Sequence, residues 1–599
     1  MFLSGGTLSP VNRPKVNMPE KQSRLPAKSG RQAHGILLVG LLCAALSYLD
    51  TLWFGFVYDD HQITRLTFAS WRTMPHLFTQ HLWAGVATHS NYYRPVLASW
   101  AMILSTLAGT STVLWHMVAV ALHLLVTVVL FYLVAELSHD QRLAAMAAAI
   151  FAVHPVHTEV VAWASGSASE ASLGFLFIFA FYAYVRSRRS PEEAPVWRII
   201  ALLFTAAAMF TKETAIVLPV LILAYEVLLG PRLPGETGLF HGKTLRRIAS
   251  NSLPFFLLAG CYLFIRSRVL HSDVLNASAI STAAVSSRFL SIPEALWFYV
   301  SHLLWPFHLS LFYSLYLVTV PSLANFWLPL FGVLVATGLL VWIALYSRLG
   351  AIASVIIALT LTVPILGMYA LPSWELVHDR YLYLPSAGFA LLVALGIRWI
   401  MQKMPGRLTG VQALSPLILL VGIYSFTTLS QTIYWTDDLS LYSRSVNIAP
   451  DNVSALCLLA NEEFSRRQRP DLALELYAKA LRIDPEDWKA NFAMGVTEFD
   501  LAQYPAAEQH FQAATRIDAS SSIGFAFLGK TRLALGDFAG AAQTFRQQIS
   551  SDPANPMGHY LLGMALLNQG QRDDARRELQ QSLTLDPASP ARQTLAQTF

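Results

Sequence analysis

Residues 113–135 read VLWHMVAVALHLLVTVVLFYLVA, an apolar run without any Asp, Glu, Lys or Arg. A helix of about 20 such residues matches the hydrocarbon thickness of a bilayer, so this run predicts a membrane-spanning helix. The composition of the whole chain agrees, because 54% of its 599 residues are hydrophobic, 13% are charged and the mean hydropathy is +0.45. These values exclude an ordinary soluble enzyme and predict an all-α fold built around a polytopic membrane domain.

Similar runs recur over the first three quarters of the chain. We predict eleven spans, at residues 35–57, 113–135, 143–160, 168–185, 197–211, 214–229, 252–266, 325–346, 351–371, 383–400 and 411–433. The apolar stretch 294–309 is short and contains a proline, so it either crosses the membrane or re-enters it. If it does not cross, all the basic loops fall on one side, as the positive-inside rule requires. We therefore prefer eleven spans, with the C-terminus on the non-cytoplasmic face.

The segments outside the spans have different compositions. Residues 1–34 are polar and basic and are expected to form a disordered cytoplasmic tail. The three cysteines, Cys43, Cys261 and Cys457, lie far apart in the sequence, which argues against a disulfide framework or a thiolate metal site. The net charge of +5 is spread over short clusters, a pattern that suits membrane orientation and not nucleic-acid binding.

A period of 34 residues appears after the last span. It is marked by Asp484, Asp518, Asp552 and Asp586, by Gly495, Gly529 and Gly563, and by Ala473, Ala507, Ala541 and Ala575. This period is typical of tetratricopeptide repeats, in which small residues let two antiparallel helices approach closely. We predict a membrane domain over 35–433, a linker over 434–450, four repeats over 451–586 and a tail over 587–599. The first repeat is degenerate, with Asn461 at the glycine position.

An acidic pair, Asp59 and Asp60, follows the first predicted span. Repulsion between adjacent carboxylates tends to raise the pKa of one of them, which suits a general base or a cation site. A solvated loop cap is the simpler interpretation of the same pair.

Two histidines, His154 and His157, stand beside Glu159 at the end of the third predicted span, on the same outer face. They are candidates for hydrogen bonds to a ligand phosphate or a carboxylate, or for plain helix-end structure. A divalent metal is the alternative that we favour least, because no third strong ligand is fixed by the spacing.

Basic residues complete the polar set on this face. Lys212 and Glu213 interrupt an apolar stretch, and they either pair with each other or serve an anionic ligand. Arg94, and Arg380 with Tyr381, lie in two aromatic segments that are also compatible with interfacial belts. One shared cavity of acidic and basic groups explains five segments on one face more economically than five unrelated loops.

These motifs, taken in order, resemble a known family. They are Tyr58-Asp59-Asp60, Tyr93-Arg94-Pro95, Phe151-Ala152-Val153-His154-Pro155-Val156-His157-Thr158-Glu159, Lys212-Glu213 and Arg380-Tyr381-Leu382-Tyr383-Leu384-Pro385. The set is similar to that of the transmembrane and tetratricopeptide-repeat O-mannosyltransferases and their bacterial relatives. The resemblance covers nearly the whole chain, including the repeats. The array of four repeats is shorter than the arrays common in animal members, which weakens the expectation of mannose and of a protein acceptor.

The resemblance implies a GT-C glycosyltransferase. Such an enzyme moves a sugar, mannose or another hexose, from a polyprenyl-phosphate carrier to a hydroxyl acceptor outside the cytoplasm. Asp59 or Asp60 is then the base. The carrier or substrate contacts fall to Arg94, His154, His157, Glu159, Lys212, Glu213, Arg380 and Tyr381. No other cofactor is expected, and the partners are the lipid bilayer and a protein bound through the repeats. The expected location is the bacterial inner membrane, or the endoplasmic reticulum membrane for a eukaryotic chain.

Two other functions compete with this interpretation. A non-catalytic membrane scaffold would use the repeats to dock a protein, but eleven spans exceed what an anchor needs. A transporter would place polar groups near the bilayer midplane, often with internal symmetry, whereas here the charged residues gather at one face. The glycosyltransferase therefore remains the preferred hypothesis.

Overall fold

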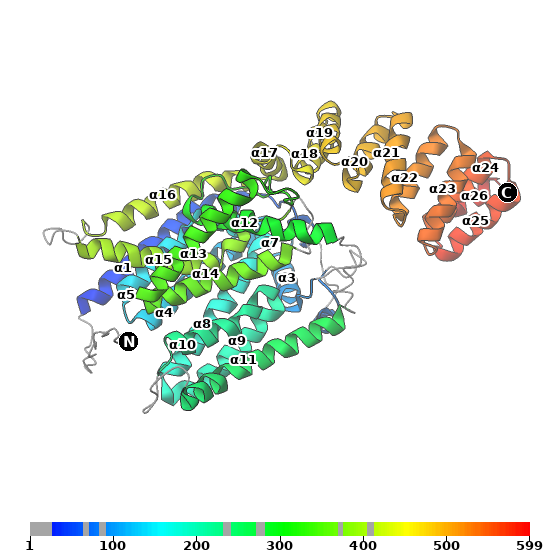
Figure 1. Ribbon diagram of the computed structural model, residues 1–599. Helices are drawn as coiled ribbons and strands as arrows, with labels where there is room; N and C mark the ends of the chain where they lie inside the picture. The colour runs from blue at the N-terminus through cyan, green and yellow to red at the C-terminus, as the bar shows by residue number, and fades with distance from the viewer. Residues whose placement is uncertain are drawn as a thin grey trace, which may run out of the picture.

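The computed structural model describes residues 27–63, 71–82, 92–231, 241–270, 282–368, 375–403 and 412–598. Within these ranges the regular structure is entirely helical. A bundle of long helices forms the N-terminal part, and an array of short helices extends away from one end of it (Figure 1). The predicted all-α class and the two-part organisation are confirmed.

In the described residues, the bundle contains α3 (Pro95–Ala108) and twelve further helices of ten residues or more. They are α1 (Ala27–Ser47), α4 (Thr112–Ser138), α5 (Gln141–Ala152), α8 (Ser172–Arg189), α9 (Ala194–Thr211), α10 (Leu218–Leu228), α11 (Gly242–Val269), α12 (Thr282–Leu304), α13 (Leu328–Tyr346), α14 (Arg348–Gly367), α15 (Pro385–Lys403) and α16 (Ser415–Thr432). The largest core cluster joins α1, α4, α5, α8, α14 and α15 through alanine-rich and aliphatic faces.

The eleven predicted spans correspond to fewer span-length helices. In the described residues, nine helical segments are long and apolar enough to cross a membrane, or ten if one bent pair is a single span. The bent pair covers the predicted span 143–160, where Pro155 follows α5 and the chain turns by 54°. The predicted span 214–229 yields only the 11-residue α10 after a 3-10 turn. The ambiguous stretch 294–309 is the second half of α12 as far as Leu304.

The outer faces of these helices are apolar. In the helical segment Leu323–Tyr346, which includes α13, only 6% of the apolar stretch is buried by protein, and Phe331, Leu339 and Trp342 are more than half exposed. Exposure of a contiguous apolar surface of this kind to water is unfavourable, whereas contact with lipid hydrocarbon is not. The chain is a multi-pass membrane protein.

The array consists of four helix pairs and a final helix. They are α18 (Val453–Ser465) with α19 (Pro470–Ile483), α20 (Trp488–Asp500) with α21 (Tyr504–Ile517), α22 (Ser522–Ala534) with α23 (Phe538–Ser551), α24 (Pro556–Asn568) with α25 (Arg572–Leu585), and α26 (Ala591–Thr598). The first helix of every pair begins after a side-chain cap, provided by Asn452, Asp487, Ser521 and Asn555 in turn. These caps satisfy backbone N–H groups of the first turn and so fix where each repeat starts.

The periodic glycines mark close helix approaches, as predicted. A Cβ atom on Gly529 would lie 2.4 Å from the ring of Phe545, and Gly495 has the same relation to Phe511 at 2.9 Å. The array therefore cannot accept a larger side chain at these positions without moving the facing helix.

The junction between the two parts is more ordered than the predicted linker and tails. Residues 434–450 contain α17 (Asp438–Ile448), residues 587–599 contain α26, and α1 begins at Ala27 inside the predicted N-terminal tail. Leu441 and Tyr442 of α17 pack with Ala455 and Leu459 of the first repeat in one cluster, which also includes Val57. The first repeat is thus packed onto the membrane domain.

Candidate active site

The acidic pair lies in a tight turn after the first span. Tyr58 has a φ of 52°, in the left-handed region that side chains other than glycine rarely adopt. Its N–H donates to Asp438 Oδ1 at 2.9 Å, and His61 Nε2 lies 2.7 Å from Asp438 Oδ2. Arg466 of the first repeat reaches the same carboxylate at 3.0 Å. Asp438, itself 1% exposed, holds the turn that carries the acidic pair.

The two aspartates of the pair have different environments. Asp60 is fully buried and accepts the backbone N–H groups of Ser165 at 2.7 Å and Val57 at 3.2 Å. Burial raises the pKa of Asp60 to about 6, although these hydrogen bonds oppose the shift. Asp60 is therefore built into the packing of the turn, and it does not border the cavity described next.

A cavity of about 150 Å³ lies beside the turn. It is bordered by Asp59, Ile63, Leu82, Tyr92, Arg94, Leu97, Trp163, Ser165, Gly166, Ser169, Glu170, Lys212, Arg380 and Tyr381. These residues come from the turn after the first span, Leu82, the start of α3, residues 163–170 before α8, the end of α9 and the segment before α15. The structure thus brings Asp59, Arg94, Lys212, Arg380 and Tyr381 of the predicted site together around one space.

Each cation at this cavity is paired with a glutamate. Arg94 donates to both carboxylate oxygens of Glu213, at 3.0 and 2.5 Å. Arg380 donates to Glu159 at 2.5 Å, and the backbone N–H of Arg380 reaches the same carboxylate at 2.8 Å. Lys212, which is 5% exposed, pairs with Glu170 and lies 4.9 Å from the centre of the Tyr381 ring. Glu159 and Glu213 therefore hold the cations in place from behind the cavity wall.

The electrostatics of the cavity follow from burial and these pairs. Burial raises the pKa of Asp59, with Arg380 opposing the shift and Glu375 adding to it. Burial also lowers the pKa of Lys212, against the attraction of Glu170. Burial alone would raise the pKa of Glu213, but Arg94 brings it down to about 2. A carboxylate with a raised pKa and a set of cations thus share one small space.

His154 and His157 lie elsewhere. Both are fully buried, His154 Nε2 lies 3.2 Å from the carbonyl oxygen of Leu303, and His157 Nε2 lies 2.8 Å from Ser386 Oγ. Their rings pack against aromatic residues, including Phe151 and Tyr424. Neither histidine borders the cavity, so the structure does not place them where the predicted contact with the carrier would occur. Their hydrogen bonds instead connect the segment after α5 to α12 and α15. Among the described residues, no group of three or more His, Cys, Asp or Glu side chains is arranged for a metal ion.

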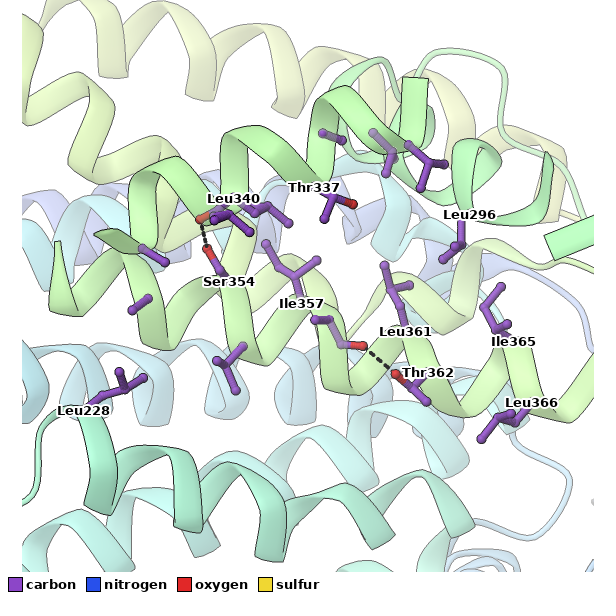
Figure 2. Close-up of a pocket in the computed structure, with 18 residues that line it drawn as sticks. Leu228, Leu296, Thr337, Leu340, Ser354, Ile357, Leu361, Thr362, Ile365 and Leu366 are labelled. Atoms are coloured by element: carbon purple, nitrogen blue, oxygen red, sulfur yellow. Dashed lines mark hydrogen bonds between the residues drawn. The ribbon is translucent and has the colours of Figure 1, made fainter. Parts of the chain in front are cut away.

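A separate, apolar groove of about 580 Å³ lies between α13 and α14, with Leu228 and Leu296 at its edges (Figure 2). Two of its hydroxyl groups bond to helix carbonyl oxygens: Ser354 donates to Leu340 at 3.3 Å and Thr362 donates to Ala358 at 2.8 Å. The groove is thus lined almost entirely by hydrocarbon, and it carries no charged side chain.

Sequence reasoning missed Asp438 and Glu375. Asp437 and Asp438 form a second acidic pair directly after the last span, so the argument applied to Asp59 and Asp60 would have found them. Glu375 lies outside any recognisable sequence pattern, and the structure reveals it through its charge near Asp59 and its hydrogen bond from Ser454 at 3.1 Å.

Comparisons with known proteins find similarity in both parts of the chain. Residues 93–237, which include Arg94, Glu159 and Lys212, match the family model for dolichyl-phosphate-mannose-protein mannosyltransferases. Residues 458–522 and 532–597 match tetratricopeptide-repeat models. The chain therefore combines a segment similar to mannosyltransferases with segments similar to tetratricopeptide repeats.

The curated relatives that the chain matches are protein O-mannosyl-transferases, and they are distant in sequence. The human protein O-mannosyl-transferase TMTC3 is 25% identical over 520 residues, covering 80% of this chain and 54% of the relative. The Drosophila melanogaster protein O-mannosyl-transferase Tmtc1 is 28% identical over 522 residues, with coverages of 72% and 60%. The chain therefore spans about half the length of the curated relatives it matches.

Proposed function

We propose that the membrane domain transfers a sugar, mannose or another hexose, from a polyprenyl-phosphate carrier to a hydroxyl group, with a protein as acceptor, in the manner of GT-C enzymes. The observation that supports this most directly is the shared cavity, in which Asp59 faces the same space as Arg94, Lys212 and Arg380. The carrier and the acceptor class come from the names of the matching family and relatives.

The chemistry needs one base and one anion site. The acceptor oxygen attacks the anomeric carbon and its proton passes to Asp59, while the bond between that carbon and the phosphate oxygen breaks. The bonding electrons leave with the polyprenyl phosphate, whose charge is stabilised by the cations. The pKa of Asp59, raised by burial, makes its carboxylate a stronger base than an exposed one.

The glutamate partners do not occupy all the N–H donors of the two arginines. A guanidinium has five N–H donors; Glu213 takes two of those on Arg94, and Glu159 takes one side-chain donor of Arg380. Donors thus remain on both arginines for a phosphate at the cavity. The glutamates keep the planes of the guanidinium groups fixed before the carrier arrives, which lowers the entropy cost of binding.

We also propose that the cavity and the repeats face the non-cytoplasmic side. The basic side chains predicted for the cytoplasmic loops lie at helix ends that do not border the cavity. There Arg398 pairs with Asp140, and Arg186 pairs with Glu136. Cysteine labelling at positions 62 and 520, which are both exposed, tests this assignment. Labelling of the two positions from opposite sides would contradict it.

The direct test uses the purified full chain in lipid nanodiscs with dolichyl phosphate carrying radiolabelled mannose. We expect release of mannose to water, and transfer when a hydroxyl-bearing peptide is added. Asp59→Asn should reduce both by about 10² to 10⁴ in rate. Glu486→Gln, which changes an exposed carboxylate in the array, serves as the matched control. If neither hydrolysis nor transfer occurs with mannosyl, glucosyl or galactosyl carriers, the proposed function is wrong.

A further inference from the structure

A second cavity, of about 530 Å³, lies where the membrane domain meets the first two repeats. It is bordered by Tyr58, Asp59, Gln62, Phe312, Glu375 and residues of α18, α19 and α20, with Asn461, Tyr477, Trp488, Lys489 and Phe492 among them. The proposed transfer step does not involve the aromatic side chains of the repeats that line this cavity.

Asp59 connects the two cavities. Among the described residues it is the only one that borders both the space with the cations and the space under the repeats. The cations Arg94, Lys212 and Arg380 are confined to the first cavity, while the second has aromatic walls and mixed charges. A base that serves two substrates must touch both of their binding sites, and Asp59 meets this condition.

We propose that the second cavity binds an extended polypeptide segment and guides one hydroxyl side chain of it to Asp59. This inference rests on the proposed function, and it names the acceptor path of the same site. Repeat arrays of this kind commonly bind extended segments in their groove. A path that begins in the array and ends at the base is what a polypeptide acceptor requires.

Aromatic residues form a continuous surface along this path. The Trp488 ring is stacked on Phe492, with centroids 4.8 Å apart and planes 8° apart, and Phe492 meets Phe527 of the next repeat edge-on at 5.3 Å. Trp488 and Phe492 are both half-buried, so part of each ring remains open to a ligand. Rigid aromatic faces of this kind provide binding energy at little conformational cost.

Polar groups suited to a peptide backbone lie beside these rings. Asn461 replaces the glycine of the repeat pattern and is exposed at the cavity. Its side-chain oxygen accepts from Tyr477 Oη at 2.5 Å, which orients the amide N–H₂ for a peptide carbonyl. The departure of the first repeat from its own pattern therefore places a hydrogen-bond donor in the proposed path.

Charge adds a second element of selectivity. Asp59 and Glu375 lie on the membrane side of the cavity, and the exposed Lys489 lies on the repeat side. A bound segment consequently meets a negative environment near the base and a positive group farther out. The sign of the charge at residue 489 should therefore influence which charged residues are accepted on either side of the peptide's hydroxyl residue.

The binding test omits the sugar donor. The probes are fluorescein-labelled synthetic peptides with a central threonine between valines, one series with lysines and one with glutamates toward the ends, added to the full chain in nanodiscs. Binding is measured by fluorescence anisotropy. We expect Phe492→Ala and Trp488→Ala to weaken binding about tenfold or more, as for aromatic hot spots.

Tyr560→Ala is the matched control, since Tyr560 lies two repeat periods beyond Phe492, on α24 and outside the cavity. It should bind as the wild-type chain does. Because loss of an aromatic ring can disturb packing, Lys489→Glu provides a second variant at an exposed position. It should shift the preference from glutamate-flanked toward lysine-flanked peptides, an effect that unfolding would not produce.

The outcomes separate the two proposals. Equal binding by Phe492→Ala, Trp488→Ala and wild type, no change of preference in Lys489→Glu, or no binding of the peptides by the wild-type chain would overturn the acceptor path. Hydrolysis of the carrier by the wild-type chain would still uphold the proposed function in that case. Conversely, the wild-type chain could bind the peptides, lose this binding in Phe492→Ala and Trp488→Ala, and turn over none of the carriers. That result would support the acceptor path and contradict the proposed function.

Discussion

The site end of the membrane domain and the repeat array are stabilised differently. Around the first cavity, Glu159, Glu170 and Glu213 each pair with a specific cation, and the carboxylates of Glu159 and Glu170 are buried. In the array, the recurring contact is a glycine under a ring, as at Gly529 and Phe545. A buried pair depends on both of its members, whereas an array is stabilised by a sum over neighbouring repeats. Single substitutions should thus be severe in the first region and local in the second.

The contact between the first repeat and the membrane domain limits how the array can be removed. Asp451 bonds to Ser314 and to Tyr316, and Ala455 and Leu459 of the first repeat belong to the same apolar cluster as Val57. A truncation at Asp451 would therefore strip the covering from the turn that carries Asp59. Truncation after Asp518 removes the third and fourth repeats and keeps this contact.

The largest effect is expected at the acidic pair. Asp59→Asn removes the proposed base and should reduce transfer by about 10² to 10⁴ in rate while the chain remains folded. Asp60→Asn loses one of two accepting oxygens that are fully buried and should chiefly destabilise the turn. Turnover per folded molecule, with hydrogen exchange at residues 57–63, distinguishes the two. Near-normal turnover in Asp59→Asn would reject Asp59 as the base.

A smaller effect is expected at Asp438, which joins the two regions. Asp438→Asn weakens the contacts to the Tyr58 N–H, to His61 and to Arg466, so the turn should spend less time in its strained conformation. We expect kcat to fall about tenfold with donor affinity unchanged, in line with losing a hydrogen bond to a charged group.

Asp437→Asn is the control for this variant. The neighbouring carboxylate only caps α17, through the Ser440 N–H at 2.8 Å, so its replacement should leave kcat unchanged. Equal losses in both variants would show that α17 acts through helix stability and not through the turn.

In the array, Gly529→Leu should lower local stability without affecting carrier hydrolysis. The new side chain would collide with the Phe545 ring, and overpacking of this kind typically costs about 1–3 kcal/mol. Hydrogen exchange should rise in α22 and α23 and much less in α18. Ala534→Leu, at an exposed position of the same helix, is the control and should change exchange little. Uniform loss of protection through the membrane domain would contradict the independence of the two regions.

The sequence predicted those features that repeat or stand out against an apolar background. The period of the glycines and the charged residues at span ends led to the array and to five residues of one cavity. Two features were outside its reach. The bend after α5 and the short α10 depend on local geometry at Pro155 and after Lys212, which hydropathy does not record. The distinction between Asp59 and Asp60 depends on which backbone N–H groups surround each carboxylate, and these come from residues as distant as Ser165.

The smallest predicted effect is a shift in pH dependence at the border of the two regions. Transfer requires Asp59 in its ionised form, so the rate should fall as the pH drops through the raised pKa of Asp59. Glu375 contributes to that raised pKa by charge repulsion, so Glu375→Gln should lower the pKa and move the acid limb of the kcat profile to lower pH, by less than about one unit. Glu486→Gln, an exposed carboxylate in the array, should leave the limb unchanged. A shift to higher pH in Glu375→Gln would have the wrong sign for charge repulsion, and an unchanged limb would mean that the group titrating in the profile is not Asp59.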